Sequence, residues 1–186
     1  MLQEESNTHE REFLATSLLY HGDSLLEHGR DDEALACYIG CGDLARREGL
    51  HDINVQSIER RVNLHRRYGN QSLAERVVRE GLNYCVSIDN YSSLLLFQRL
   101  LCSILRKKGE TLLAMEMAFT GLELAQNENC HHEEMSFFQH LTAIARERGE
   151  SREALDLAKG ALRKAKNLSL ENWSSLFRLE IERAES

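Results

Sequence analysis

Two stretches of the chain, GRDDEALACYIGC at residues 29–41 and GESREALDLAKGA at residues 149–161, share a glycine, a glutamate four positions later and an alanine directly after it. The glycine recurs every 40 residues, and an alanine always follows it five positions later. The two columns are Gly29, Gly69, Gly109 and Gly149, and Ala34, Ala74, Ala114 and Ala154. Two strict columns at one period indicate a repeat array, so the repeat decides the fold.

Apolar residues between these glycines follow the spacing of amphipathic helices, as Leu112, Met115, Phe119 and Leu122 do. Glycine accepts the left-handed conformation that ends a helix, and a polar residue beyond it can cap the next helix. We therefore expect a short turn at each column glycine and a longer polar joint between one helix pair and the next. The expected helices span residues 8–28, 31–48, 52–68, 71–88, 91–108, 111–128, 132–148, 151–167 and 170–184.

This pattern resembles the tetratricopeptide repeat (TPR) family. The resemblance is carried by the turn glycines, the alanine column, Tyr38 and the small residues seven positions beyond each alanine, which are Cys41, Gly81, Gly121 and Ala161. It implies an all-α, right-handed α-solenoid of four TPR-like helix hairpins at about 9–48, 52–88, 91–128 and 132–167, a capping helix at 170–184, and one domain over residues 1–186. The period of 40, longer than the common one of about 34, resembles kinesin light chains and bacterial sensor and regulator proteins.

Small residues are needed because helices approach closely only where the side chains at their crossing are small. A single hairpin cannot bury its own apolar face, so neighbouring hairpins must stack. The last expected helix carries an apolar side with Leu170, Trp173, Leu176, Phe177 and Ile181. We expect it to cover the end of the stack, with Trp173 in the core of this cap.

The net charge of −7 and the 6% of aromatic residues argue against a protein that binds nucleic acid by neutralising phosphates. No apolar stretch is long enough to span a bilayer, and the first residues do not resemble a secretory signal. Five scattered cysteines fit reduced thiols better than a disulfide framework. We expect a cytoplasmic protein that binds neither nucleic acid nor membrane.

Few residues suggest chemistry. Cys130, His131, His132, Glu133 and Glu134 lie together, but two histidines four apart around a glutamate are absent, and acidic residues in a first helical turn stabilise the helix dipole. We expect no metal site here and no cofactor elsewhere. The chain has no phosphate-binding glycine loop and no nucleophile motif, so we expect no catalytic residues and no enzyme activity.

Arginine is the most informative polar residue. Arg66, Arg106 and Arg146 stand one period apart, each in the last turn of the first helix of a pair. In the TPR family these first helices line a concave groove in which partner peptides lie. By that resemblance the partner-binding candidates are Gln56, Glu59, Arg60, Asn63, Arg66, Arg67, Leu96, Arg99, Ser103, Arg106, Lys107, Gln139 and Arg146.

A row of guanidinium groups suits the carboxylates of an acidic segment. Arginines in a last turn also stabilise the helix dipole without any partner, so both interpretations stay open. The first hypothesis is a non-catalytic protein–protein interaction module, an adaptor or scaffold that binds an acidic peptide or helix. The alternative is a ligand- or peptide-sensing regulatory domain of a larger signalling or transcription regulator. Self-association through the C-terminal helix is a further expectation.

Overall fold

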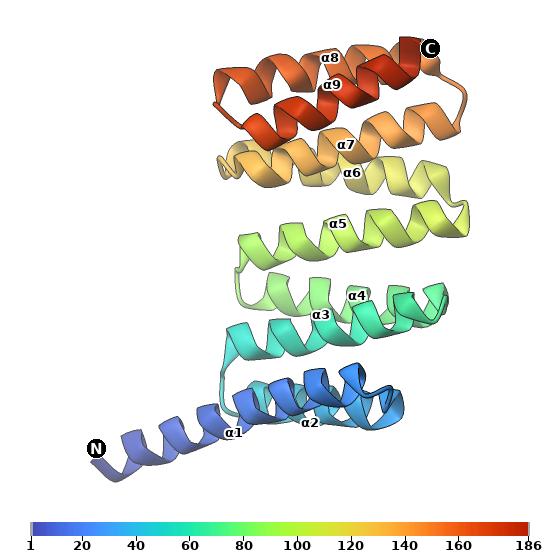
Figure 1. Cartoon of the computed structure of the whole chain (residues 1–186). Coiled ribbons are helices and arrows are strands. Elements are labelled where there is room, and N and C mark those ends of the chain that lie inside the picture. Colours follow the sequence, from blue (N-terminus) through green and yellow to red (C-terminus); the bar gives the residue numbers. More distant parts are fainter. Residues whose placement is uncertain (1, 186) are drawn as a thin grey trace. The chain divides into compact units, whose positions relative to one another are not determined.

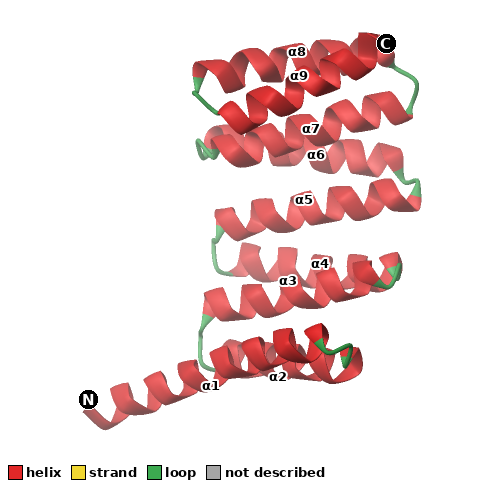
Figure 2. Cartoon of the chain, in the orientation of Figure 1, coloured by secondary structure: helices red, strands yellow, loops and turns green. Residues whose placement is uncertain are grey.

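The computed structural model describes residues 2–185, and this part of the chain consists of helices joined by short loops (Figure 1, Figure 2). The helices are α1 (Leu2–Glu27), α2 (Asp31–Arg47), α3 (His51–Arg67), α4 (Gln71–Ser87), α5 (Tyr91–Lys108), α6 (Thr111–Asn127), α7 (His131–Glu147), α8 (Ser151–Asn167) and α9 (Glu171–Glu185). The predicted all-α class is confirmed, and the bounds of α2 to α9 agree with the expected ones to within one residue. The expected start of α1 at residue 8 was wrong, since the helix begins at Leu2.

A left-handed residue follows each helix from α1 to α8, at intervals of 20 residues. The φ angles lie between 51° and 79°, and the residues are Gly29, Gly49, Gly69, Asp89, Gly109, Asn129, Gly149 and Ser169. The predicted turns at the four column glycines are confirmed. The prediction of longer joints between pairs was wrong, because the joint at residues 48–50 is as short as the turn at residues 28–30.

The left-handed residue closes α1, α2, α3, α5, α6, α7 and α8 through two backbone hydrogen bonds. After α1, the Arg30 N–H donates to the Leu25 carbonyl at 2.9 Å, and the Gly29 N–H donates to the Leu26 carbonyl at 3.2 Å. After α8, Leu170 and Ser169 donate in the same way, at 2.9 and 3.1 Å. This is the Schellman motif, which satisfies carbonyls that the helix itself leaves without partners.

Among the starts of α2 to α8, the two asparagines provide the side-chain caps. Asn70 Oδ1 accepts from the Leu73 N–H at 3.2 Å, and Asn90 Oδ1 accepts from the Ser93 N–H at 2.9 Å. Glu110 and Glu150 occupy the same position before α6 and α8 and make no such bond. The expected capping by any polar residue beyond the turn is therefore correct for asparagine and wrong for glutamate, whose longer side chain is a poor cap.

The helices form two compact units, unit 1 up to Asp89 and unit 2 from Asn90 onward. In unit 1 each helix from α1 to α4 packs against the next. In unit 2 the helices from α5 to α9 pack in the same consecutive order, and α5 also contacts α7. Consecutive packing of hairpins is the architecture of an α-solenoid. The expectation of a single domain over residues 1–186 stays a prediction.

Small residues allow the neighbouring helices to approach. The alanine column is buried in α2, α4, α6 and α8. At Gly121 of α6, an added Cβ would lie 2.2 Å from Cζ of Phe137, which α7 lays across it. At Gly22 of α1, an added Cβ would lie 2.6 Å from Cε1 of Tyr38. Glycine is thus required at these two positions because an aromatic ring fills the space of a side chain.

The last helix closes unit 2. Phe177 is fully buried, and Trp173, Leu176 and Ile181 pack around it against α7 and α8. Ser175, Arg178 and Glu182 of α9 are exposed, whereas the residues three periods earlier in α3, Val55, Ile58 and Val62, are buried. This polar face is typical of a terminal capping helix, as predicted. Over residues 2–185 no helix combines the length and the hydropathy of a bilayer-spanning segment.

Exchanging Ser169 for glycine should stabilise the protein. Serine at φ 55° strains its backbone against its own Cβ, and glycine has no Cβ. Ser169→Gly should raise the free energy of unfolding by about 0.5–1 kcal/mol, measured by urea denaturation. Asn129→Gly is the matched control and should gain less, since asparagine enters this conformation more readily. A loss of stability in Ser169→Gly would contradict the assigned role of the joint.

The contact between Gly121 and Phe137 predicts a strong asymmetry between two helix glycines. Gly121→Ala should lower the free energy of unfolding by about 1–3 kcal/mol, because its Cβ overpacks against the ring. Gly160→Ala is the matched control: it lies inside α8 with open space around it, so alanine should stabilise by up to about 1 kcal/mol. Equal effects of the two substitutions, measured by thermal and urea unfolding, would argue against the packing described.

Candidate functional site

The candidate residues lie on the first helices of three hairpins. The six from Gln56 to Arg67 are on α3 of unit 1, the five from Leu96 to Lys107 are on α5 of unit 2, and Gln139 and Arg146 are on α7 of unit 2. In unit 2, α5 and α7 are in contact, so their candidates share one surface. Arg66, Arg106 and Arg146 are each in the last turn of their helix, as predicted.

In unit 2 the arginines form ion pairs between successive first helices. Arg106 Nη2 of α5 lies 2.5 Å from Glu147 Oε1 of α7, and Arg106 Nη1 lies 3.3 Å from His140 Nδ1. Two further ion pairs join Arg99 to Glu133 at 3.3 Å and Arg146 to Glu180 at 2.7 Å. We call the three ion pairs of Arg99, Arg106 and Arg146 the arginine ladder. Each guanidinium of the ladder therefore already engages a carboxylate of the chain itself.

Sequence reasoning found the arginines of the ladder and missed the glutamates. Glu147 follows Arg106 by 41 residues, and Glu180 follows Arg146 by 34 residues. These separations are close to one period of 40, so an arginine on one first helix can contact a glutamate on the next first helix. An acidic residue 34 or 41 positions after each arginine was the signal that could have identified the pairs.

In unit 1 one candidate arginine is part of a clamp between helices. Arg60 Nε of α3 lies 3.0 and 3.2 Å from the two carboxylate oxygens of Asp23 on α1, and the Tyr38 hydroxyl donates to Asp23 at 2.8 Å. Burial alone would lower the pKa of Arg60, but the hydrogen bond and charge of Asp23 outweigh it and raise that pKa. Burial and the same carboxylate raise the pKa of Tyr38 well above its usual range.

A second network in unit 1 was not predicted. Glu80 of α4 accepts from Arg61 at 3.1 Å and from Arg46 at 2.9 Å, which links α2, α3 and α4. Burial would raise the pKa of Glu80, but the two guanidinium groups more than offset that effect and lower it. Arg61 is thus held inside unit 1, on the opposite side of α3 from the candidate residues Asn63 and Arg67 by helical spacing.

Two candidate cations have no partner among the described residues. Arg67 at the end of α3 and Lys107 at the end of α5 are exposed, and neither has a hydrogen bond or ion pair with the described residues. We call them the unpaired cations. Asn63 is exposed and its Oδ1 accepts from Arg66 at 3.3 Å. Of the remaining candidates, Gln56 is exposed and Glu59, Leu96, Ser103 and Gln139 are half-buried.

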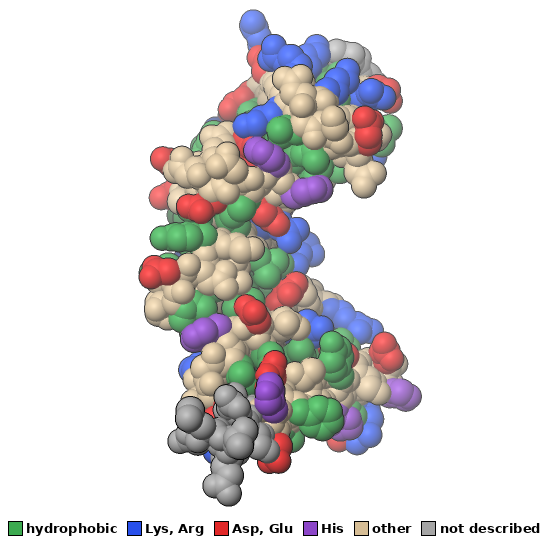
Figure 3. Space-filling model, turned by 90° about the vertical axis from the view of Figure 1, so that its left-hand side faces the viewer, with side chains coloured by type: hydrophobic (Ala, Val, Ile, Leu, Met, Phe, Trp, Pro, Cys, Tyr) green, Lys and Arg blue, Asp and Glu red, His purple; other side chains and the backbone are tan. Residues whose placement is uncertain are grey.

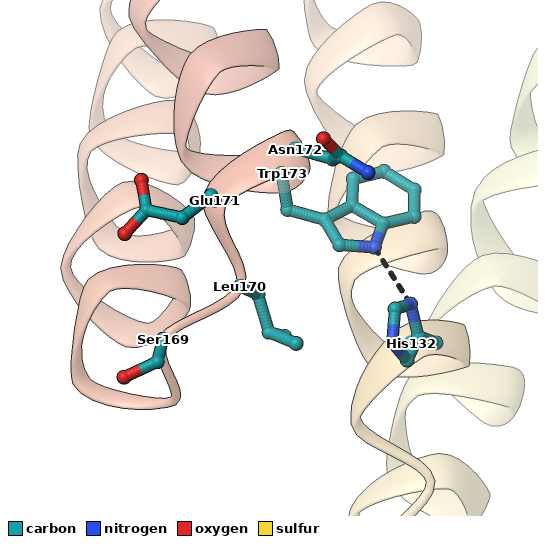
Figure 4. A pocket seen from close by; sticks show the side chains of 6 residues that line it. All are labelled: His132, Ser169, Leu170, Glu171, Asn172 and Trp173. Atoms are coloured by element: carbon teal, nitrogen blue, oxygen red, sulfur yellow. Dashed lines mark hydrogen bonds between the residues drawn. The ribbon is translucent and has the colours of Figure 1, made fainter.

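A small pocket of about 220 Å³ lies where α9 begins, beside the start of α7. Its lining includes His132, Ser169, Leu170, Glu171, Asn172 and Trp173. Figure 4 shows Trp173 and His132 turned toward each other, and the Trp173 Nε1–H donates to His132 Nδ1 at 3.2 Å. The Trp173 ring also lies over Phe177 with a centroid separation of 6.1 Å, so it belongs both to the predicted cap and to the pocket wall.

The acidic residues at the start of α7 have a structural role. Glu133 and Glu134 lie in its first turn, as expected, but Glu134 is almost fully buried. Its carboxylate accepts from Lys164 of α8 and from Gln126 of α6, the latter at 2.9 Å. Within residues 2–185, the groups that could ligate a metal do not gather in threes at this junction or elsewhere.

Three cysteines pack in the cores of the two units. Cys41, Cys85 and Cys102 are buried, and burial raises the pKa of the first two thiols to about 11 and that of Cys102 to about 12. These thiols are therefore protonated at neutral pH, which makes them poor nucleophiles. Cys102 donates weakly to the Ala114 carbonyl at 3.3 Å. Cys37 and Cys130 are half-buried.

No protein-family model matches the chain, and no curated protein matches it. Solved structures do. TPR-like repeats described as those of a kinesin light chain from Podosopora anserina superpose with a TM-score of 0.70 at 14% identity, covering 91% of this chain and 84% of that one; a variant of these repeats gives 0.71. BtubC from P. vanneervenii gives 0.58 at 14% identity, with 94% and 87% covered. These likenesses confirm the predicted TPR-like fold.

Proposed function

We propose that this chain, which has the TPR-like fold, is a non-catalytic protein–protein interaction module that binds an acidic peptide or helix of a partner. In unit 2 the binding surface is made by the first helices α5 and α7, and the candidate residues of unit 1 form a separate set on α3. The observation that carries the proposal is the arginine ladder of unit 2, continued by the unpaired cation Lys107.

The ladder can exchange its carboxylate partners. The side chains of Arg99 and Arg146 retain 39% and 49% of their exposure, so their ion pairs are screened by solvent. Such pairs contribute only about 0–1 kcal/mol to stability, and a carboxylate from a partner can replace the chain's own at little cost. The guanidinium groups also hold defined positions on α5 and α7, which favours two-point binding of an incoming carboxylate.

The ends of the first helices attract acidic segments although the chain as a whole is negative. The last turn of α3 contains His65, Arg66 and Arg67, and the last turn of α5 contains Arg106, Lys107 and Lys108. Arg67 of unit 1 and Lys107 of unit 2 have no hydrogen bond or ion pair with the described residues, so an acidic partner of either unit can contact them without breaking an existing pair. Binding through such exposed charges should weaken as salt is added.

A sensing role is a second candidate function, favoured by the pocket beside Trp173. Its volume of about 220 Å³ suits a small ligand, and an aromatic ring with a hydrogen-bonded histidine lines it. The Trp173 ring that such a ligand would contact also packs α9 against α7 and α8. This arrangement would couple occupancy of the pocket to the stability of unit 2.

Charge reversal of the unpaired cations tests the interaction module. Arg67→Glu in unit 1 with Lys107→Glu in unit 2 should reduce capture of specific partners from a native extract at least tenfold, because each unit then loses the exposed cation that an acidic segment can contact. Arg47→Glu with Lys166→Glu is the matched control: it makes the same charge change in the last turns of second helices, α2 and α8, and should retain those partners. Affinity capture with quantitative mass spectrometry measures both, and circular dichroism confirms equal melting. Identical capture by both variants would contradict the proposed surface.

Fluorescence of Trp173 tests the sensing role, since it is the single tryptophan of the chain. A panel of dipeptides and nucleotides should include a compound that shifts the emission and raises the melting temperature by a few degrees, through selective binding to the folded state. Trp173→Phe should lose the response, and Tyr20→Phe, which lies in unit 1, should keep it. A panel without any coupled change in emission and melting would count against the sensing role.

A further inference from the structure

Helix α6 of unit 2 carries an apolar stripe on the side that is not packed against α5 or α7. The exposed fractions are 69% for Leu112, 46% for Leu113 and 47% for Phe119. Leu112, Glu116, Phe119 and Glu123 follow one another at helical spacings of four, three and four, so they lie on one line. We call these four residues with Leu113 the α6 stripe.

The fold does not require this stripe to be apolar. The packing of α6 uses another side of the helix, where Ala114, Ala118, Gly121 and Ala125 are buried. One period later, α8 places only charged residues on the line that corresponds to the stripe, namely Arg152, Asp156, Lys159 and Arg163. Large apolar side chains that are exposed on one helix and absent from its counterpart indicate an interaction surface.

The stripe adjoins a hollow that can receive a side chain. Its volume is about 440 Å³, and its lining includes Glu116, Phe119, Thr120, Leu122, Glu123 and Gln126. From Leu112 to Glu123 the stripe is about 16 Å long at the helical rise, which corresponds to three turns of a docked helix. Met115 and Met117 are half-buried at its edges, and their flexible side chains can adapt to a partner.

The charges around the stripe indicate the kind of partner. Helix α6 contains Glu116 and Glu123 and has no lysine or arginine between Thr111 and Asn127. Figure 3 shows, by contrast, Lys and Arg side chains gathered over α8 and α9, where α8 has Lys159, Arg163, Lys164 and Lys166. A cationic partner is therefore attracted to α6 and repelled from the exposed side of α8.

We propose that the α6 stripe binds an amphipathic helix of a partner protein, with an apolar stripe of Leu, Met or Phe and flanking Lys or Arg residues. Leu112 and Phe119 contact the apolar stripe of this helix, and Glu116 and Glu123 pair with its flanking cations. This surface belongs to a second helix of a hairpin and takes a basic ligand, so it is independent of the acidic-segment surface on the first helices.

A designed peptide tests the proposal on the full chain. The probe is an 18-residue, N-acetylated and C-amidated helix of leucine at positions i, i+3, i+4 and i+7 with lysine elsewhere, and its counterpart has glutamate in place of lysine. Leu112→Ala with Phe119→Ala should weaken binding of the lysine peptide at least tenfold, measured by calorimetry. The matched control, Ile39→Ala with Val86→Ala, removes exposed apolar side chains from α2 and α4 and should bind as the unmodified chain does.

Two further measurements decide the outcome. Glu116→Lys with Glu123→Lys should reverse the preference, so that the glutamate peptide binds more tightly than the lysine peptide. Equal binding of the lysine peptide by the unmodified chain and by Leu112→Ala with Phe119→Ala would overturn the proposal. Sedimentation equilibrium without peptide gives the other contrary result: self-association that the same double substitution abolishes would assign the stripe to a second copy of the chain.

Discussion

The whole structure depends on the close approach of neighbouring helices at small residues. Where α7 lays Phe137 across α6, Gly121 leaves no Cβ in its way, and the alanine column is buried in every second helix. Closely packed helices leave little room for side chains where they cross. The positions of the small residues therefore determine which sides of the helices meet. The exposed side chains are not constrained by this packing, and the α6 stripe is made of such side chains.

The ion pairs between first helices show how one set of residues serves two purposes. In unit 1 the pair of Arg60 with Asp23 is supported by Tyr38, so it holds α1 and α3 together. In unit 2 the ladder arginines Arg99 and Arg146 are more exposed, at 39% and 49%, than Arg60 at 28%. The first arrangement holds two helices together, whereas Arg99 and Arg146 have the accessibility that an exchangeable contact needs.

Much of the fold could be predicted from the sequence, because the glycine and alanine columns record backbone geometry directly. The joints between pairs were all predicted too long. In three of them Asp89, Asn129 and Ser169 adopt the left-handed conformation without being glycine, so the 20-residue interval was not visible in one residue type. The candidate site was predicted only in part. The periodic arginines marked the first helices, but their pairing with Glu147 and Glu180 depends on the offset between neighbouring helices, which spacing within one helix does not reveal. The α6 stripe was hidden among apolar residues that sequence alone assigns to the core.

The even spacing of the joints restricts how such a chain can change in length. Each helix from α2 to α8 occupies 20 residues with its joint, and helices alternate between the two roles of a hairpin. A duplication of 20 residues would place every later helix in the role of its neighbour and move buried alanines to the surface. Growth by gene duplication can therefore proceed only in steps of two helices, whereas any such step preserves the roles of all the helices that follow.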